Sequence, residues 1–299
     1  MSIGESRAVR GAMALVAFMG ISAVSAAQPA APQRAEFTHG GVTRSYLVVT
    51  PVEPSPPASR SLLLMLHGCT QDAADAARGT QLHVAAASAG MTTVYAEQPV
   101  ASHPQRCWNW YVRAQTTRGA GEVDFLAALA RRVAAEQGIP GARIVVAGIS
   151  AGGAMAANLL YAYPDVFRAA AVHSGVAAFA ARDLTSGLAA MRGGPPPLDA
   201  LVTAALEAAP EVPIARVALL AIHGDTDAVV SPANLDALLA QAIGVATRRA
   251  VPVQTERLLI PGLGHAWSGG SREGTFTDPS REAVAPRVVQ FLRARLDER

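Results

Sequence analysis

A serine in a glycine-rich turn is the residue of this sequence best suited to act as a nucleophile. Ser150 is the centre of the pentapeptide GISAG at residues 148–152, and a further glycine follows it. The segment 143–147 predicts a strand, and residues 151–163 predict a helix. A sharp strand-to-helix turn raises a serine hydroxyl at the edge of a sheet and points a helix N-terminus at it. The alternative is a glycine-rich turn that carries the serine incidentally.

A serine hydroxyl needs a base, and the sequence offers one histidine and two aspartates in a suitable order. On a strand–turn–helix of this kind the acid and then the histidine follow the serine along the chain. Asp225 and Asp227 follow the buried strand predicted at 217–222, and both suit the acid position. His265 lies in a glycine-rich loop after the strand predicted at 255–260. These residues predict a Ser-His-Asp site; a loop histidine without a role is the alternative for His265.

Two backbone amides are expected to bind the negative charge that develops on a substrate oxygen. The N–H of Ala151, the residue after the serine, supplies the first. The second is expected from the loop after the strand predicted at 62–66. Gly68 in that loop permits a close approach of the backbone, so we expect the N–H of Cys69 to be the second donor.

Cys69 and Cys107 are the two cysteines of the chain. Two thiols cannot form a structural zinc site alone, and no other ligands stand near them at a suitable spacing, so we expect no metal. In an oxidising compartment they would form one disulfide, with two buried free thiols as the alternative. Aromatic residues near the second cysteine and after the histidine are either substrate contacts or core residues: Trp108, Trp110, Tyr111 and Trp267.

The first 27 residues have the pattern of a cleavable signal peptide. Arg7 and Arg10 precede a short apolar stretch at 11–24, and small residues follow. A spanning helix needs roughly 20 apolar residues, so a retained membrane anchor is the weaker alternative. We expect a signal peptide at 1–27, a secreted or periplasmic protein, and no stable membrane insertion after cleavage. Residues 28–34 are rich in proline and alanine and predict a flexible lead-in.

Composition excludes several classes of protein. Hydrophobic residues make up 51% of the chain and charged residues 16%, so a large core can form and global disorder is excluded. A formal net charge of +2 gives no broad basic field, and we expect no nucleic-acid partner. The sequence contains no lysine, which excludes Schiff-base, pyridoxal-phosphate and phosphate-loop chemistry. No cofactor is expected.

Strands and helices are predicted to alternate along the chain. Beyond those already named, strands are expected at 43–50, 92–96 and 169–172, and helices at 70–90, 123–137 and 286–296. This alternation predicts an α/β fold, a mostly parallel sheet with helices on both faces, in a single domain at 28–299. The proline-containing segment 176–213 interrupts the alternation and is either a cap or pocket wall or a solvated connection.

Together these segments resemble the polyhydroxybutyrate-depolymerase-like esterases, an α/β-hydrolase family that includes feruloyl and other carbohydrate esterases. The matching stretches lie at 66–71, 107–111, 148–153, 223–230 and 264–270. The resemblance implies an α/β-hydrolase fold, with Ser150 as the nucleophile and His265 as the base. It favours Asp227 as the acid, because the family pattern places the acid three residues before a valine, here Val230.

The resemblance implies a secreted serine esterase that hydrolyses short hydroxyalkanoate oligomers or polyesters through an acyl-enzyme. A feruloyl or acetyl-xylan esterase acting on plant cell-wall esters is the nearest alternative. A secreted, non-catalytic binding protein on a hydrolase scaffold is the alternative from another class. Secreted depolymerases of solid polyester usually resemble a catalytic domain followed by a linker and a polymer-binding domain. This sequence ends in a predicted helix soon after His265, so we expect soluble oligomers or short esters as substrates.

Overall fold

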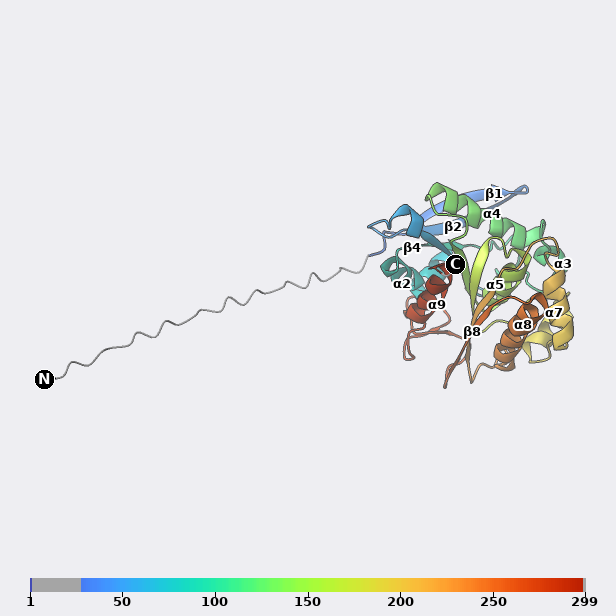
Figure 1. The fold of residues 1–299 in the computed structure, drawn as a ribbon. Helices are drawn as coiled ribbons and strands as arrows, with labels where there is room; N and C mark the ends of the chain where they lie inside the picture. Colours follow the sequence, from blue (N-terminus) through green and yellow to red (C-terminus); the bar gives the residue numbers. More distant parts are fainter. Residues whose placement is uncertain (2–27, 298–299) are drawn as a thin grey trace.

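The computed structural model describes residue 1 and residues 28–297, and Figure 1 shows how their helices and strands are arranged. A sheet of eight strands runs through this part of the chain in the order β1-β2-β4-β3-β5-β6-β7-β8. The strands are β1 (Gln33–His39), β2 (Val42–Val49), β3 (Ser61–Leu66), β4 (Met91–Ala96), β5 (Ile144–Ile149), β6 (Phe167–His173), β7 (Val217–Gly224) and β8 (Val253–Ile260). β2 pairs antiparallel with β1 and β4, and the pairs from β4 to β8 are parallel. The sheet is mostly parallel, as predicted.

Helices cover both faces of the sheet, which confirms the predicted α/β architecture. One face is covered by α1 (Ala73–Thr80), α2 (Leu82–Ser88) and α9 (Ala285–Asp297). The other is covered by α4 (Gly121–Glu136), α5 (Ala151–Ala162), α7 (Leu198–Glu207) and α8 (Ala233–Arg249). The connections contain η1 (Pro57–Ser59), α3 (Arg113–Thr116), α6 (Leu184–Met191) and the short strands β9 (Trp267–Ser268) and β10 (Thr277–Asp278).

Strand β3, at the centre of the sheet, is apolar from Leu62 to Leu66 because both of its faces are buried. In β3, Leu62, Leu64 and Leu66 pack in the core on the α4–α5 side, whereas Leu63 and Met65 pack on the α1–α9 side. All five side chains are fully buried. A strand that is apolar on both faces must lie at the centre of the sheet. The position of its carboxyl end is set by that placement.

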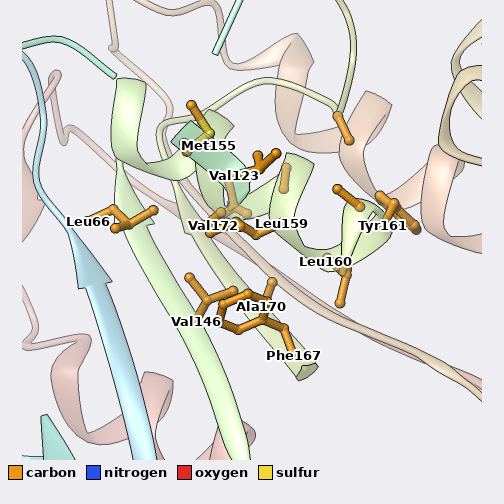
Figure 2. Close-up of a cluster of buried hydrophobic side chains, with 14 of the residues drawn as sticks. Leu66, Val123, Val146, Met155, Leu159, Leu160, Tyr161, Phe167, Ala170 and Val172 are labelled. Atoms are coloured by element: carbon orange, nitrogen blue, oxygen red, sulfur yellow. The ribbon is translucent and has the colours of Figure 1, made fainter. Parts of the chain in front are cut away.

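Helix α5 is held against the sheet by a cluster of large apolar side chains, shown in Figure 2. Met155 and Leu159 from the helix lie against Val146 of β5 and Val172 of β6. Each of these four side chains is fully buried. This packing fixes the N-terminal end of α5 at the edge of the sheet where β5 ends.

The segment 70–90, predicted as one helix, forms two. Helix α1 ends at Thr80, Gln81 has a left-handed backbone with φ of 49°, and α2 follows. The N–H of His83 donates to the hydroxyl oxygen of Tyr95 at 3.0 Å. The prediction of an unbroken helix was wrong because a side chain from the neighbouring strand β4 takes the place of a helical acceptor.

The lead-in predicted at 28–34 is ordered at its end, which corrects a second expectation. Strand β1 begins at Gln33, and Arg34 pairs with Leu47 across the sheet and with the carboxylate of Glu97 at 3.0 Å. Apart from residue 1, the predicted signal peptide lies outside the described residues. Within the part of the chain that the structure describes, no helix is both long enough and apolar enough to cross a bilayer.

Candidate active site

Ser150 lies in a strained turn between β5 and α5. Its φ of 57° and ψ of −122° fall in a region of backbone angles that residues other than glycine rarely adopt. Its N–H donates to the carbonyl of His173 at 2.9 Å, which ties the turn to β6. A Cβ atom on Gly148 would collide with the carbonyl oxygen of Gly152, and one on Gly152 would collide with that of Leu66. The two glycines of the GISAG motif are required by this close packing of backbone.

The structure brings Ser150, His265 and Asp227 together in one chain of hydrogen bonds. Ser150 Oγ lies 2.9 Å from His265 Nε2, and His265 Nδ1 lies 2.7 Å from Asp227 Oδ2. Since an ionised carboxylate only accepts hydrogen bonds, Nδ1 carries the imidazole proton and Nε2 is free to accept the proton of the serine hydroxyl. These are the contacts that a base-activated serine nucleophile requires.

Asp227 is held as a carboxylate by several donors. Its Oδ1 accepts hydrogen bonds from the N–H groups of Val229 and Val230, each at 2.9 Å. Nε2 of the buried His223 lies 3.3 Å from Oδ2. Burial alone would raise the pKa of Asp227, but the hydrogen bonds from His223, His265 and Val230 outweigh burial and hold that pKa well below its ordinary value.

Asp225, the other candidate acid, is turned away from the histidine. Its Oδ1 accepts a hydrogen bond from the N–H of Gly262 at 2.6 Å, and its side chain is exposed. This contact holds together the loops that follow β7 and β8. The two alternatives that the residues alone left open are therefore separated by geometry, since Asp227 contacts His265 and Asp225 does not.

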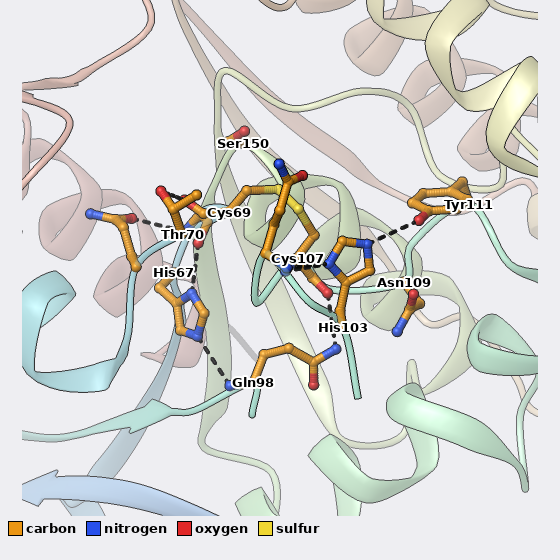
Figure 3. The surroundings of a disulfide bond; sticks show 12 residues. His67, Cys69, Thr70, Gln98, His103, Cys107, Asn109, Tyr111 and Ser150 are labelled. Atoms are coloured by element: carbon orange, nitrogen blue, oxygen red, sulfur yellow. Dashed lines mark hydrogen bonds between the residues drawn. A yellow bond between two sulfur atoms is a disulfide. The ribbon is translucent and has the colours of Figure 1, made fainter. Parts of the chain in front are cut away.

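The loop after β3 brings the backbone of Gly68 and Cys69 next to the serine. A Cβ atom on Gly68 would lie 3.4 Å from the Cβ of Ser150. His67 Nε2 accepts from the N–H of Gln98 at 3.1 Å, so His67 Nδ1 carries the proton and donates to the Gly68 carbonyl at 2.7 Å. In a planar trans peptide the N–H of Cys69 then points away from His67, and Figure 3 shows Ser150 on the side of Cys69 opposite His67.

Both expected oxyanion donors are available. Within the described residues the N–H of Cys69 makes no hydrogen bond. Ala151 is the first residue of α5, where a helix leaves its N–H groups without helical acceptors. The positive end of the helix dipole adds to the attraction for a negative oxygen. The predicted pair of donors, Cys69 and Ala151, therefore flanks Ser150.

Gln71 and Asp75 connect the Cys69 loop to the loop after β9. Gln71 is buried; its Oε1 accepts from the N–H of Gly68 at 2.9 Å, and its Nε2 donates to Asp75 at 3.0 Å and to the carbonyl of Thr275 at 2.9 Å. Thr275 returns hydrogen bonds to Asp75 from its N–H and its hydroxyl. Reasoning from the sequence missed this connection, because 204 residues separate its two ends.

A disulfide joins Cys69 to Cys107, as predicted, and Figure 3 shows it beneath Ser150. It ties the segment 107–111 to the loop that carries the Cys69 N–H. His103 supports the same segment, since its Nδ1 accepts from the N–H of Cys107 at 3.3 Å. The alternative of two free thiols is excluded.

Removal of this disulfide is expected to reduce both stability and activity. The bond closes a loop with a sequence separation of 38 residues, so the Cys69→Ala, Cys107→Ala double variant should lose about 4 kcal/mol of unfolding free energy. Its kcat should also fall, because the Cys69 amide is less firmly placed. Urea unfolding and ester hydrolysis measure the two effects. Dithiothreitol should weaken the native protein in the same way and leave the double variant unchanged; equal sensitivity of both would contradict the assignment.

Of the four aromatic residues proposed as substrate contacts, one lines the cavity beside Ser150. Trp110 lines a small cavity of about 40 Å³ that also contains Ser150, Cys69 and Ala151. Tyr111 packs edge-on against Trp110 and does not line this cavity. The wall is completed by residues that reasoning from the sequence missed: Ala154, Ser174, Gly175, Val176, Met191 and Val230. Val176 and Met191 belong to the irregular segment 176–213, which therefore contributes two residues to the wall of this cavity.

Trp108 and Trp267 are core residues, which corrects their assignment as pocket residues. Trp108 is fully buried between the ring of His67, 5.5 Å away, and the guanidinium of Arg44, 5.5 Å from its centroid. Trp267 is buried in a stack on His173 with ring centroids 5.1 Å apart. Both indoles pack against histidines at the ends of strands. They therefore support the strand ends that carry the site and expose no surface to a substrate.

His173 is a buried histidine that is held neutral. Its Nε2 accepts from the N–H of Ser268 at 3.3 Å, and its Nδ1 lies 3.1 Å from the hydroxyl of Ser174. Burial, reinforced by repulsion from His223 and His265, lowers the pKa of His173 to about 3. Burial likewise lowers the pKa of His67.

These buried histidines are expected to make the fold acid-sensitive. Between the unfolded pKa of 6.5 and the folded pKa of about 3, only the unfolded state binds a proton at residue 173. The unfolding free energy should therefore fall as pH is lowered through this window, by about 1.4 kcal/mol per pH unit for this group. Urea unfolding between pH 6 and pH 4 measures the slope, which His173→Gln should reduce by that amount. An unchanged slope would refute the neutral buried state.

No cluster of three or more histidine, cysteine or acidic side chains suited to a metal ion occurs among residues 28–297. The contacts described above join the serine, the histidine and the aspartate and place backbone amides beside them. Such a set can deprotonate a hydroxyl, attack a carbonyl carbon and stabilise the oxyanion that results.

Comparison with known proteins places the chain in a family. A family model described as esterase PHB depolymerase matches residues 46–249. The chain belongs to the esterase PHB depolymerase family. The match includes Ser150 and Asp227 and ends before His265, so the place of the histidine in this member of the family rests on the geometry above.

The curated relatives of this family member include proteins named as depolymerases and proteins named as feruloyl esterases. Poly(3-hydroxyalkanoate) depolymerase C of Paucimonas lemoignei is 33% identical over 46% of this chain and 33% of the relative. Feruloyl esterase B of Neurospora crassa is 33% identical over 45% of this chain and 44% of the relative. The chain thus spans less than half the length of either relative.

Solved structures show the same fold. An acetyl xylan esterase from Aspergillus awamori superposes with a TM-score of 0.66 at 19% identity, covering 78% of this chain and 94% of that one. S-formylglutathione hydrolase from Staphylococcus aureus has a TM-score of 0.57 at 16% identity and covers 90% of this chain and 100% of its own. The predicted α/β-hydrolase fold of this esterase PHB depolymerase family member is confirmed.

Proposed function

We propose that the protein is a serine carboxylic-ester hydrolase that uses Ser150, His265 and Asp227. The observation that carries this proposal is the continuous hydrogen-bond chain from the Ser150 hydroxyl through the imidazole to the Asp227 carboxylate. Membership of the esterase PHB depolymerase family supports it. A non-catalytic binding protein would have no need for a strained serine, a base and two free amides at one point.

The proposed reaction has two halves. In the first, Ser150 Oγ attacks the ester carbonyl carbon while His265 Nε2 takes the hydroxyl proton, and Asp227 stabilises the imidazolium that forms. The imidazolium then gives its proton to the leaving alkoxide, which departs as the alcohol and leaves an acyl-serine. In the second half His265 removes a proton from water as the oxygen of that water adds to the acyl carbon. The bond from the acyl carbon to Ser150 Oγ then breaks, the imidazolium returns the proton to Oγ, and the acid is released.

Two amides stabilise the tetrahedral intermediates of both halves. The N–H groups of Cys69 and Ala151 flank the serine and have no competing acceptors among the described residues. Each donor directed at the oxyanion contributes about 3 kcal/mol to lowering the barrier in comparable sites. The disulfide and the His67 hydrogen bond to Gly68 keep the Cys69 peptide in that orientation.

We infer short hydroxyalkanoate esters, as oligomers or polyester, as the substrate class. The cavity beside Ser150 is small, about 40 Å³, and its lining is mostly apolar, from Trp110, Met191 and Val230 among others. A short aliphatic acyl group matches these properties better than the bulky aromatic group of a feruloyl ester. The likeness to a poly(3-hydroxyalkanoate) depolymerase supports the same class.

A feruloyl or acetyl-xylan esterase is the second candidate, because relatives and a solved structure carry those names. A panel of hydroxybutyrate oligomers, acetylated xylan, feruloylated sugars and short aryl esters distinguishes the candidates. The proposal expects the largest kcat/KM for the hydroxybutyrate oligomers and the smallest for the feruloyl esters. A preference for feruloyl esters would replace it.

We further propose that residues 1–27 are a signal peptide, that residues 28–299 are one catalytic domain, and that the protein acts in the periplasm or outside the cell. The disulfide between Cys69 and Cys107 supports an oxidising compartment. N-terminal sequencing of the exported protein tests this, with a new N-terminus expected after residue 26 or 27.

A further inference from the structure

A second cavity lies outside the site of Ser150, between helices α3 and α7. Figure 1 shows these two helices on the same side of the molecule. Its volume of about 120 Å³ is three times that of the cavity beside the serine. Its walls come from three separate segments of the chain. They are formed by Arg113, Thr116, Thr117, Phe179, Ala181, Arg182, Ala204, Glu207 and Ala208.

Two arginines without partners face this cavity. Arg113 opens α3 and Arg182 precedes α6, and neither guanidinium has a hydrogen bond or an ion pair within the described part of the chain. Most arginines in the described part of the chain are paired, for example Arg118 with Asp165 at 2.7 Å. Two unpaired guanidinium groups on one cavity are suited to a carboxylate, which arginine binds through two parallel hydrogen bonds.

The remaining walls define the rest of the ligand. Glu207 also lines the cavity, has no partner among the described residues, and can accept a hydrogen bond from a hydroxyl group. Phe179, Ala204 and Ala208 present apolar surface for a short alkyl chain. A carboxylate, a hydroxyl and a short alkyl group are the parts of a 3-hydroxy acid.

The cavity wall is held in a strained conformation. Phe179 has a φ of 56°, and its N–H donates to Oδ1 of the buried Asn158 at 2.8 Å. One residue earlier, the N–H of Ala178 donates to Oε1 of the buried Gln241 at 2.9 Å. Backbone strain that is maintained by two buried amides is typical of binding sites, because it fixes the wall before a ligand arrives.

The same asparagine connects the cavity to the proposed active site. Asn158 Nδ2 donates to the carbonyl of Trp110 at 3.1 Å, and Trp110 lines the cavity beside Ser150. Helix α6 makes a second connection, since Arg182 precedes its first residue and Met191, its last, lines the serine cavity. Its eight residues set the two cavities about 12 Å apart along the helix.

We propose that this cavity binds the carboxylate of a short 3-hydroxy acid through Arg113 and Arg182, with Glu207 accepting from the hydroxyl. The inference rests on the proposed function, because hydrolysis of hydroxyalkanoate esters produces such acids. The carboxylate comes either from the free acid or from the carboxyl end of an oligomer whose scissile ester lies at Ser150.

Binding of 3-hydroxybutyrate to the full-length protein, followed by calorimetry, tests the proposal without any hydrolysis. The Arg113→Met, Arg182→Met double variant should bind at least tenfold more weakly, about 1.4 kcal/mol. Binding of the neutral methyl ester, measured on a Ser150→Ala background, should be the same with and without the two arginine substitutions. Arg272→Met is the matched control, since Arg272 is exposed, lies outside both cavities, and has no side-chain partner within the described residues. Equal binding by the double variant would overturn the proposal.

Kinetics distinguish the two sources of the carboxylate. If the oligomer end is bound, the double variant raises KM for an oligomer with a free carboxyl group and leaves KM for the same oligomer capped as a methyl ester unchanged. If only the free acid is bound, both KM values are unchanged while binding of 3-hydroxybutyrate is lost. A protein that binds the acid but hydrolyses no ester would contradict the proposed function and leave this site standing.

Discussion

Ser150→Ala is expected to lower kcat for ester hydrolysis by about a million-fold while the protein remains folded. The alanine removes the oxygen that attacks the carbonyl, and neither His265 nor the amides of Cys69 and Ala151 can replace it. The substitution removes one oxygen atom from a turn whose backbone is fixed by Gly148 and Gly152. Steady-state kinetics on a short aryl ester, with circular dichroism as the check of folding, measure the effect.

Ser174→Ala is the matched control for that substitution. Ser174 lines the same cavity, but its hydroxyl contacts His173, at 3.1 Å, and does not contact His265. This variant should keep most of the native activity. A fluorophosphonate probe should label Ser150 in the native protein and in the Ser174→Ala variant. Full activity or labelling after Ser150→Ala would remove Ser150 as the nucleophile.

Asp227→Asn is expected to reduce kcat by about 10,000-fold. The carboxylate fixes the imidazole with its proton on Nδ1 and stabilises the charge that His265 acquires during the reaction. An amide in its place can donate to Nδ1, which favours the tautomer with the proton on Nε2, and a protonated Nε2 cannot accept from Ser150. The loss should therefore appear in kcat more than in KM.

Asp225→Asn is the control for this prediction, since Asp225 stands two residues away with the same charge. Within the described residues, the one hydrogen bond of its side chain comes from the N–H of Gly262, which an asparagine oxygen can also accept. Its kcat should stay close to that of the native protein. Comparable losses in the two variants would mean that general disturbance of the loop, rather than the acid role of Asp227, explains the result.

The residues of the serine–histidine–aspartate chain could be predicted because each depends on a local pattern. GISAG lies between a strand and a helix, and Asp227 and His265 lie in the loops after two further strands, so all three are placed at the carboxyl edge of one sheet. The choice between Asp225 and Asp227 needed more than the local pattern. Both follow β7, and only the side-chain directions in the structure separate them.

The parts that sequence could not provide depend on contacts between distant segments. Trp108 and Trp267 have the composition of pocket residues, yet packing against His67 and His173 buries them. Met191 belongs to a segment without clear periodicity, and only the placement of α6 brings it to the cavity. The break between α1 and α2 likewise depends on the hydroxyl of Tyr95, which comes from strand β4.

The hydrogen bonds of Gln71 have a consequence for the motion of the site. One carboxamide binds the Gly68 N–H, the Asp75 carboxylate and the Thr275 carbonyl, so the loop with the proposed oxyanion donor and the loop after β9 share a single support. Displacing either loop therefore breaks hydrogen bonds of the buried Gln71 side chain, which holds both loops. The conformational entropy of these loops is therefore lost during folding rather than when substrate binds. Heating should therefore release these two loops together rather than one before the other.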